Sequence, residues 1–312
     1  MLQSIWDDAK RELSRGNMIT QLIIINIGVF VLINLVRLFL FLGNGGTVPQ
    51  LYDTILHFFC MSSDWKFFLT HPWGMFTSMF LHEGFWHLLW NMLFLYWFGR
   101  IVGDFIGDQR ILPLYLLGGL MGAVVFFLSA NMLPYGAGGR FALGASAGVM
   151  AIVVAAGTIS PDYIMRLLLI GDVKLKYIVA VLVFLDLILI PQGGNTGGHF
   201  AHLGGAFFGW LFVAQLRKGN DFSEPVNNML DKIRDFFNRL TSGRRSGRRP
   251  KVVYRNPNRR TTARGKSASD TAKKNNSAYQ EKLDAILDKI KDSGYDSLTK
   301  EEKEFLFNAS KQ

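Results

Sequence analysis

The chain has 312 residues, of which 49% are hydrophobic and only 19% are charged, and its mean hydropathy is positive at +0.19. Soluble globular domains seldom show this balance, so the composition predicts a membrane protein. The formal net charge is +10, but the basic residues lie mostly in one tail and in short loops, which argues against a nucleic-acid partner. A single cysteine, Cys60, excludes an internal disulfide framework and a cysteine-rich metal site.

Six apolar stretches follow one another along the first two thirds of the chain, and each is read as a membrane-spanning helix. They cover about 18–42, 85–105, 111–132, 141–159, 175–190 and 200–216. Residues 1–17 are polar and show no cleavable signal pattern, so the first stretch is expected to stay as a span. The pattern predicts an all-α polytopic membrane protein with a six-transmembrane-helix bundle over residues 18–217.

The charges of the short loops predict how this bundle is oriented. Lys and Arg gather before span one, between spans two and three, between spans four and five, and after span six, whereas the opposite loops carry only Lys66 and Arg140. Positive residues favour the cytoplasmic side of a membrane. Both termini are therefore expected to be cytoplasmic.

The first loop on the opposite side, residues 43–82, is too long for a simple connection and too apolar for a solvated one. Its aromatic residues, Trp65 and Trp73 among them, favour short amphipathic helices in the interfacial zone. An ordinary aromatic belt at the membrane interface is the alternative.

The chain changes character after Lys218. Residues 218–276 are expected to form a basic flexible linker, whose stretch 243–266 should be drawn to anionic lipid. Residues 277–312 show an apolar helical face, and Thr299 and Glu302 have the spacing of a capping box. A small cytoplasmic helical hairpin is predicted there.

Two residues of separate spans have the chemistry of nucleophilic catalysis. Ser146 lies among small residues near the outer end of span four, at a depth of roughly 7 Å from the 1.5 Å rise per helical residue, and His202 lies about as deep in span six. Gly144, two residues before the serine, and Gly205, three residues after the histidine, would let the two helices approach closely. Neutral His202 could then take the proton of the Ser146 hydroxyl as it attacks a carbonyl carbon.

Span two offers two further polar side chains in the same layer. His87 and Asn91 are four residues apart and project from one face of the helix. With the backbone N–H of Ser146 they could stabilise an oxyanion. Asp186 shares this layer and could be a third member of the catalytic group, although a polar contact of span five is the interpretation we favour.

Two other protease chemistries fit the sequence poorly. His82, Glu83 and His87 resemble the start of a zinc-protease motif, but the second histidine comes at i+5 instead of i+4, so no metal is predicted. An aspartyl mechanism needs two carboxylates at one depth, whereas Asp172 and Asp186 belong to opposite ends of a span. No cofactor is expected.

The chain resembles the rhomboid family of intramembrane serine proteases over most of residues 18–216. The resemblance is carried by the run Trp73–Asn91, by Gly144-Ala145-Ser146 and by Ala201-His202-Leu203-Gly204-Gly205. It implies a Ser146–His202 dyad, with His87 and Asn91 at the oxyanion and with His82, Gly144, Ala147 and Gly205 as supporting residues.

The resemblance also implies that transmembrane segments of other proteins are cut near the outer face of the membrane, and that the chain lies in a bacterial inner membrane. Two positions depart from the family pattern: Ala147 stands where glycine is usual, and Gly74 follows Trp73 where arginine is usual. The alternative function is a catalytically inactive rhomboid-like protein that binds membrane helices without cleaving them.

Overall fold

A computed structural model describes residues 17–133, 140–167, 170–241, 282–291 and 297–309 of the chain. The chain divides into two compact units, Met1–Arg244 and Arg245–Gln312, which are described separately. Residues 1–16 and the basic stretch 243–266, for which lipid contact is predicted, lie outside the described residues.

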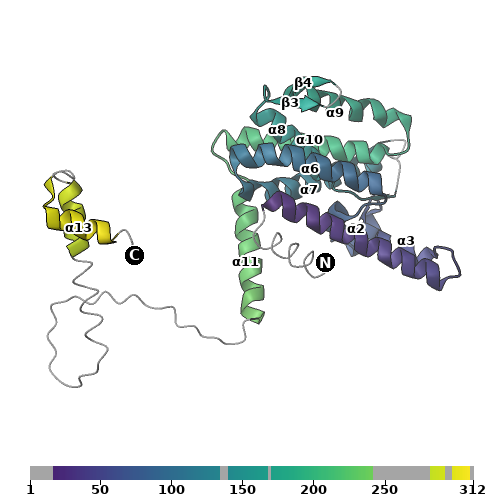
Figure 1. Cartoon of the computed structure of the whole chain (residues 1–312). Coiled ribbons are helices and arrows are strands. Elements are labelled where there is room, and N and C mark those ends of the chain that lie inside the picture. Colours follow the sequence, from purple (N-terminus) through teal and green to yellow (C-terminus); the bar gives the residue numbers. More distant parts are fainter. Residues whose placement is uncertain (1–16, 134–139, 168–169, 242–281, 292–296, 310–312) are drawn as a thin grey trace, which may run out of the picture. The chain divides into compact units, whose positions relative to one another are not determined.

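The bundle of the first unit consists of six helices, which lie side by side (Figure 1). They are α2 (Met18–Gly43), α6 (Phe85–Ile106), α7 (Ile111–Met132), α8 (Ser146–Ile159), α9 (Leu175–Leu189) and α10 (Thr196–Leu216). Helix α10 packs against α7, α8 and α9, while α8 also packs against α6 and α7. The core between them is apolar and fully buried, with Leu95, Tyr115, Ile152 and Phe212 at its centre.

The described strands are short pairs at the edges of this bundle, so the fold is all-α and that of a polytopic membrane protein. By length and apolar composition alone, three described helices could each cross a membrane: Met18–Gly43, Asp108–Met132 and Leu175–Gln192. Helices α6 and α10 have 22 and 21 residues but are less apolar on average than these three, and α8 is apolar but has only 14 residues.

The basic connections meet at one end of the bundle. The backbone N–H of Met18, at the start of α2, donates to the Asp108 carboxylate at 3.0 Å. Arg110 forms an ion pair with Asp221 at 2.7 Å, and Arg217 Nη2 donates to the carbonyl of Thr158 at 2.6 Å. The loop between α6 and α7, the end of α8 and the end of α10 therefore lie on the same side as the beginning of α2.

The long loop 43–82 folds at the opposite end into short elements, as its aromatic pattern predicts. These are α3 (Gln50–Phe59), β1 (Met61–Ser62), α4 (Trp65–Thr70), α5 (Gly74–Thr77) and a 3₁₀ turn, η1 (Ser78–Phe80). Strand β1 pairs antiparallel with β2 (Phe141–Ala142), and Trp73 Nε1 donates to the carbonyl of Phe58 at 2.8 Å. The loop is thereby tied to the segment that leads into α8.

Two spans begin at other residues than predicted. The span expected at 141–159 is wrong over its first five residues, because Phe141 and Ala142 form β2 and Gly144 has a positive φ of +131°. That backbone conformation is not helical. The span expected from residue 200 begins four residues earlier, at Thr196.

The prediction of a flexible linker over 218–276 is also wrong in its first part. Residues Ser223–Thr241 form helix α11, which runs across the direction of the bundle helices (Figure 1). Its first turn is fixed by the Arg110–Asp221 ion pair and by Asn227 Nδ2, which donates to the carbonyl of Gln109 at 3.1 Å. A two-stranded hairpin, β3 (Ile164–Leu167) and β4 (Gly171–Lys174), joins α8 to α9.

The second unit contains a helix at 282–291 and α13 (Lys300–Ala309). The side chain of Glu302 accepts from the backbone N–H of Thr299 at 2.7 Å, which is the capping box that the spacing predicts. Lys289 reaches the same carboxylate at 2.9 Å, and Ile286 and Leu298 are buried between the two segments. The two helices thus pack on each other.

Candidate active site

Ser146 is the first residue of helix α8, and this position sets its depth in the bundle. At about 1.5 Å per residue, the 14 residues of α8 span roughly 21 Å and the 22 residues of α7 roughly 33 Å. Because both helices reach the basic end of the bundle, Ser146 lies roughly 12 Å below the far end of α7. The serine is therefore recessed well below that end of the bundle, at the level that its 14-residue distance from the end of α8 gives it.

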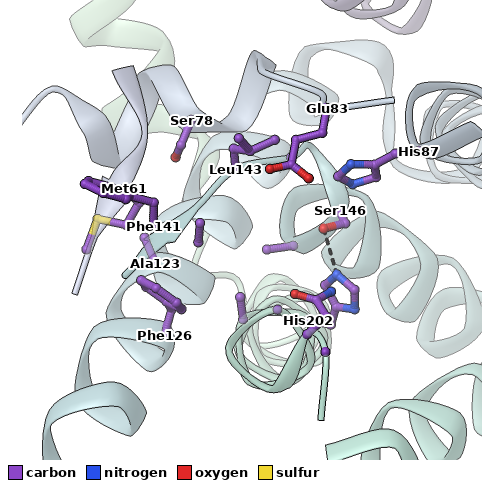
Figure 2. A pocket seen from close by; sticks show the side chains of 17 residues that line it. Met61, Ser78, Glu83, His87, Ala123, Phe126, Phe141, Leu143, Ser146 and His202 are labelled. Carbon is purple, nitrogen blue, oxygen red and sulfur yellow. Dashed lines mark hydrogen bonds between the residues drawn. The ribbon is translucent and has the colours of Figure 1, made fainter. Parts of the chain in front are cut away.

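The hydroxyl of Ser146 faces His202 on helix α10 (Figure 2). Ser146 Oγ lies 2.7 Å from His202 Nε2, which is hydrogen-bond distance. Glycines bring the two helices together, because a Cβ on Gly205 or Gly209 would collide with the carbonyl oxygen of Ala147 or Ala151. The predicted close approach of these helices is thus built from backbone contact.

Ala147, where the resembled family has glycine, is accommodated by the neighbouring helix α7. Its methyl group faces Gly122, where an added Cβ would collide with that of Ala147. The same arrangement recurs one turn on, between Ala151 and Gly118. A methyl group at position 147 therefore fills space that glycine at 122 leaves open.

Two cavities reach the pair Ser146 and His202. The first, of about 390 Å³, is lined by these two residues together with Glu83 and His87, and its apolar wall includes Phe126 and Phe141 (Figure 2). The second, of about 410 Å³, lies on the side of α6 and α9 and is lined by the exposed Trp86 and Trp90 and by Leu185 and Asp186. The pair Ser146 and His202 therefore borders open space on two sides.

His87 and Asn91 lie on the face of α6 that borders these cavities. The His87 ring rests against Gly144, since a Cβ there would come within 2.9 Å of His87 Nε2. Asn91 is buried, and its amide donates to the carbonyl of His87 at 2.8 Å. Glycine is therefore required at position 144 for two reasons: its φ is positive, and the His87 ring leaves no room for a Cβ.

His82 lies behind His87 rather than in the cavity. It is buried at 2% exposure, and its ring packs edge to face against that of His87 with centroids 5.1 Å apart. Burial, together with the nearby His87, lowers the pKa of His82 to about 4, so this imidazole is neutral at physiological pH. The contact is consistent with a supporting position for His82.

His199 is a residue that the sequence analysis missed, and Asp186 is one for which it favoured a lesser role. Asp186 is buried, and its Oδ1 lies 2.8 Å from Nδ1 of His202 and 2.8 Å from Nδ1 of His199. The interpretation of Asp186 as a mere polar contact of span five therefore understated its place, and His199 was not singled out at all. The spacing of His199 and His202, three residues apart on one helical face, was the available signal.

Asp186, His199 and His202 each offer an atom that can bind a metal ion, and these three atoms lie within 4.8 Å of one another. Around a tetrahedral zinc, however, nitrogen and oxygen ligands about 2.0–2.1 Å from the metal are roughly 3.3 Å apart. The observed separations of 2.8 Å are hydrogen-bond lengths instead. The cluster is better described as a hydrogen-bonded network.

Comparison with known proteins agrees with this architecture. The family model described as Rhomboid domain matches residues 69–219, and one described as a family of unknown function (DUF6576) matches residues 271–312.

Two curated relatives illustrate the similarity. "RHOMBOID-like protein 12, mitochondrial" of Arabidopsis thaliana is 32% identical over 46% of this chain and 46% of its own length. "Presenilin-associated rhomboid-like protein, mitochondrial" of Homo sapiens is 28% identical over 53% of this chain and 43% of its own length. The match thus covers less than half of either relative.

Proposed function

The chain belongs to the rhomboid family, and on that premise we propose that it is an intramembrane serine endopeptidase. Its substrates are transmembrane segments of other membrane proteins, cut near the membrane face opposite the basic end of the bundle. The observation that carries this proposal is the 2.7 Å contact between Ser146 Oγ and His202 Nε2 beside a cavity below the end of α7.

In the proposed reaction, Ser146 Oγ attacks the carbonyl carbon of the scissile peptide bond while its proton passes to His202 Nε2. His202 then gives that proton to the leaving amine, and the C–N bond breaks to leave an acyl-enzyme. A water molecule, deprotonated by the same Nε2, attacks the ester carbon and releases the new carboxyl group and the serine. One histidine serves as base and acid in turn.

The negative charge on the carbonyl oxygen forms next to α6. Asn91 and His87 border the space around Ser146, and the backbone N–H of Ser146 is unpaired within α8 because it is the first residue of that helix. Donors fixed in place before the reaction stabilise an oxyanion without reorganisation. We assign this role to these three groups.

Access from the bilayer is proposed through the second cavity, between α6 and α9. Trp86, Trp90 and Leu185 are 67%, 53% and 45% exposed there, which gives an apolar entrance for a membrane segment. The backbone carbonyls of a helix are already paired, so a segment must unwind locally before Ser146 can attack it. Substrates with helix-weakening residues near the cut should therefore be preferred.

For location, the chain is an integral membrane protein, and we propose that both ends of its bundle domain face the same side, where the basic residues gather. The names of the relatives contain the word mitochondrial, which conflicts with the expectation of a bacterial inner membrane. We therefore propose the topology without assigning the membrane. A cysteine introduced at residue 17 and one introduced at residue 218 should both react with an impermeant label added to one side of sealed vesicles, and neither should react with label on the other side.

A fluorophosphonate probe tests the proposed activity directly. The purified chain should react with the probe, Ser146→Ala and His202→Ala should not, and Ser160→Ala at the other end of the same helix should react as the wild type does. Absence of labelling in the wild type, or labelling that survives Ser146→Ala, would overturn the protease and leave the inactive, helix-binding alternative.

A further inference from the structure

We propose that Asp186 and His199 are positioning residues for His202, so that the dyad is one end of a hydrogen-bonded chain of four side chains. This inference rests on the proposed function and adds two residues to it. Its basis is a single carboxylate oxygen, Asp186 Oδ1, that lies 2.8 Å from Nδ1 of both His202 and His199.

The setting of Asp186 makes an incidental contact a poor explanation. It is the single acidic residue of α9, a helix that is otherwise almost entirely apolar, and only 7% of its surface is exposed. A carboxylate buried at membrane depth is costly unless polar groups satisfy it. Two imidazole N–H groups supply that satisfaction, and both come from one face of α10, which packs against α9.

The contact fixes which nitrogen of His202 carries the proton. A carboxylate accepts hydrogen bonds, so the hydrogen of neutral His202 resides on Nδ1, facing Asp186. Nε2 is then unprotonated and points at Ser146 Oγ, 2.7 Å away. This is the tautomer that can accept the serine proton, and Asp186 holds the ring in that state before the substrate arrives.

Asp186 also stabilises the state that follows proton transfer. Once Nε2 has taken the serine proton, His202 is an imidazolium in a largely buried position, where a positive charge is disfavoured by burial. The negative charge of Asp186 at 2.8 Å offsets that penalty.

His199 acts on the carboxylate from its other side. Its side chain is 13% exposed and its ring stands nearly perpendicular to that of His202, with the ring centroids 5.9 Å apart. By donating from Nδ1 to the same oxygen, it prevents rotation of the carboxylate away from His202. We therefore expect His199 to set the position of Asp186 without touching the substrate.

Four variants test this chain of contacts in the full-length protein. Asp186→Asn, which keeps the shape of the side chain, should lower kcat for a cleaved transmembrane substrate at least roughly a hundredfold, with KM little changed. His199→Leu should lower kcat about tenfold, the worth of one ordinary hydrogen bond, and His199→Gln should restore most of it by offering an amide donor. Asp162→Asn, an exposed residue at the basic end, is the matched control and should keep wild-type kcat.

A second readout separates positioning from general destabilisation. In protein labelled with ¹⁵N-histidine, His202 should show a protonated, hydrogen-bonded Nδ1 and an unprotonated Nε2, and Asp186→Asn should change that pattern while the thermal midpoint in detergent stays near the wild-type value. The proposal would be overturned if Asp186→Asn and His199→Leu both kept the wild-type kcat, or if Nδ1 of His202 carried no proton. Either result would leave the proposed protease function standing as long as Ser146→Ala is inactive. If the wild-type chain itself neither labels nor cleaves, the proposed function fails first, and this inference with it.

Discussion

Asn91 is the residue whose side chain tests the assigned oxyanion position most directly. It is buried at 6% exposure, borders the cavity that contains Ser146, and keeps its place through the bond to the carbonyl of His87. Replacing Asn91 with Ala should lower kcat roughly 10²- to 10³-fold and leave KM nearly unchanged, because the lost bond forms only when the oxyanion does.

Asn220→Ala is the control for this change, since Asn220 is an exposed residue at the basic end. Steady-state cleavage of a reconstituted transmembrane substrate measures both constants. A rise in KM with unchanged kcat would assign Asn91 to substrate binding instead.

His82 should make the stability of the fold depend on pH. Its folded pKa of about 4 lies below the ordinary value of 6.5, so between these values the unfolded chain binds a proton that the folded chain does not. Stability should therefore fall as pH is lowered from 6.5 to 4, by at most about 1.4 kcal/mol per pH unit from this group.

Thermal unfolding in detergent at several pH values measures this effect. His82→Phe should flatten the dependence in that window. An unchanged slope in His82→Phe would mean that other groups carry the pH dependence.

At the scale of single residues, the sequence predicted the Ser146 and His202 contact but not its extension. Small residues around Ser146, and the glycines after His202, mark a close helix contact that a single sequence reveals through composition. For Asp186 the sequence indicated only its depth in the membrane. Whether its side chain faces α10 depends on how α9 packs in the folded bundle, which the sequence pattern does not reveal. His199 carried no distinct signal beyond its spacing from His202.

The contact of α8 with α10 depends on glycine at 205. Because an added Cβ would collide with the carbonyl oxygen of Ala147, Gly205→Ala should push the helices apart, lower the thermal midpoint and move His202 away from Ser146. Gly28→Ala in α2 is the matched change, since nothing lies within 4 Å of the added methyl and alanine favours a helix by about 1 kcal/mol.

Both variants are compared by thermal unfolding in detergent and by the rate of fluorophosphonate labelling. Gly28→Ala should be neutral or stabilising and label normally. Equal behaviour of the two variants would show that α8 and α10 can separate at no cost, contrary to the packing described.

Element boundaries were the least predictable part of the fold, and the reasons are local. The apolar run from residue 141 looks helical throughout, but the pairing of β2 with β1 and the bond from the backbone N–H of Gly144 to the Ser78 carbonyl are contacts distant in sequence. In α11 the signal was present, since Met229, Ile233 and Phe236 recur at helical spacing, but the polar composition outweighed it.

Across the bundle, the helices that carry most of the polar side chains of the site differ from those that could span a membrane by length and composition. Helices α6, α8 and α10 carry the polar side chains His87, Asn91, Ser146, His199 and His202, and none of the three is both long enough and apolar enough to span a membrane on its own. The helices α2, α7 and α9 are both long and apolar enough, and among them only α9 contributes a polar residue, Asp186, to the network. Polar side chains at this depth are tolerated because they face the protein interior.

The two compact units lead to the final prediction, that the catalytic machinery is complete within residues 1–244. All residues assigned to the reaction belong to the first unit. Within the second unit, Lys289 forms an ion pair with Glu302, and the apolar side chains of Ile286 and Leu298 are buried. A chain ending after residue 244 should therefore react with a fluorophosphonate at the wild-type rate and keep its thermal midpoint in detergent. The Ser146→Ala version of the same truncated chain is the control for specific labelling. Loss of labelling with an unchanged midpoint would show that the second unit acts on the site, and restoring the rate by adding residues 245–312 as a separate polypeptide would identify that action as a binding contact.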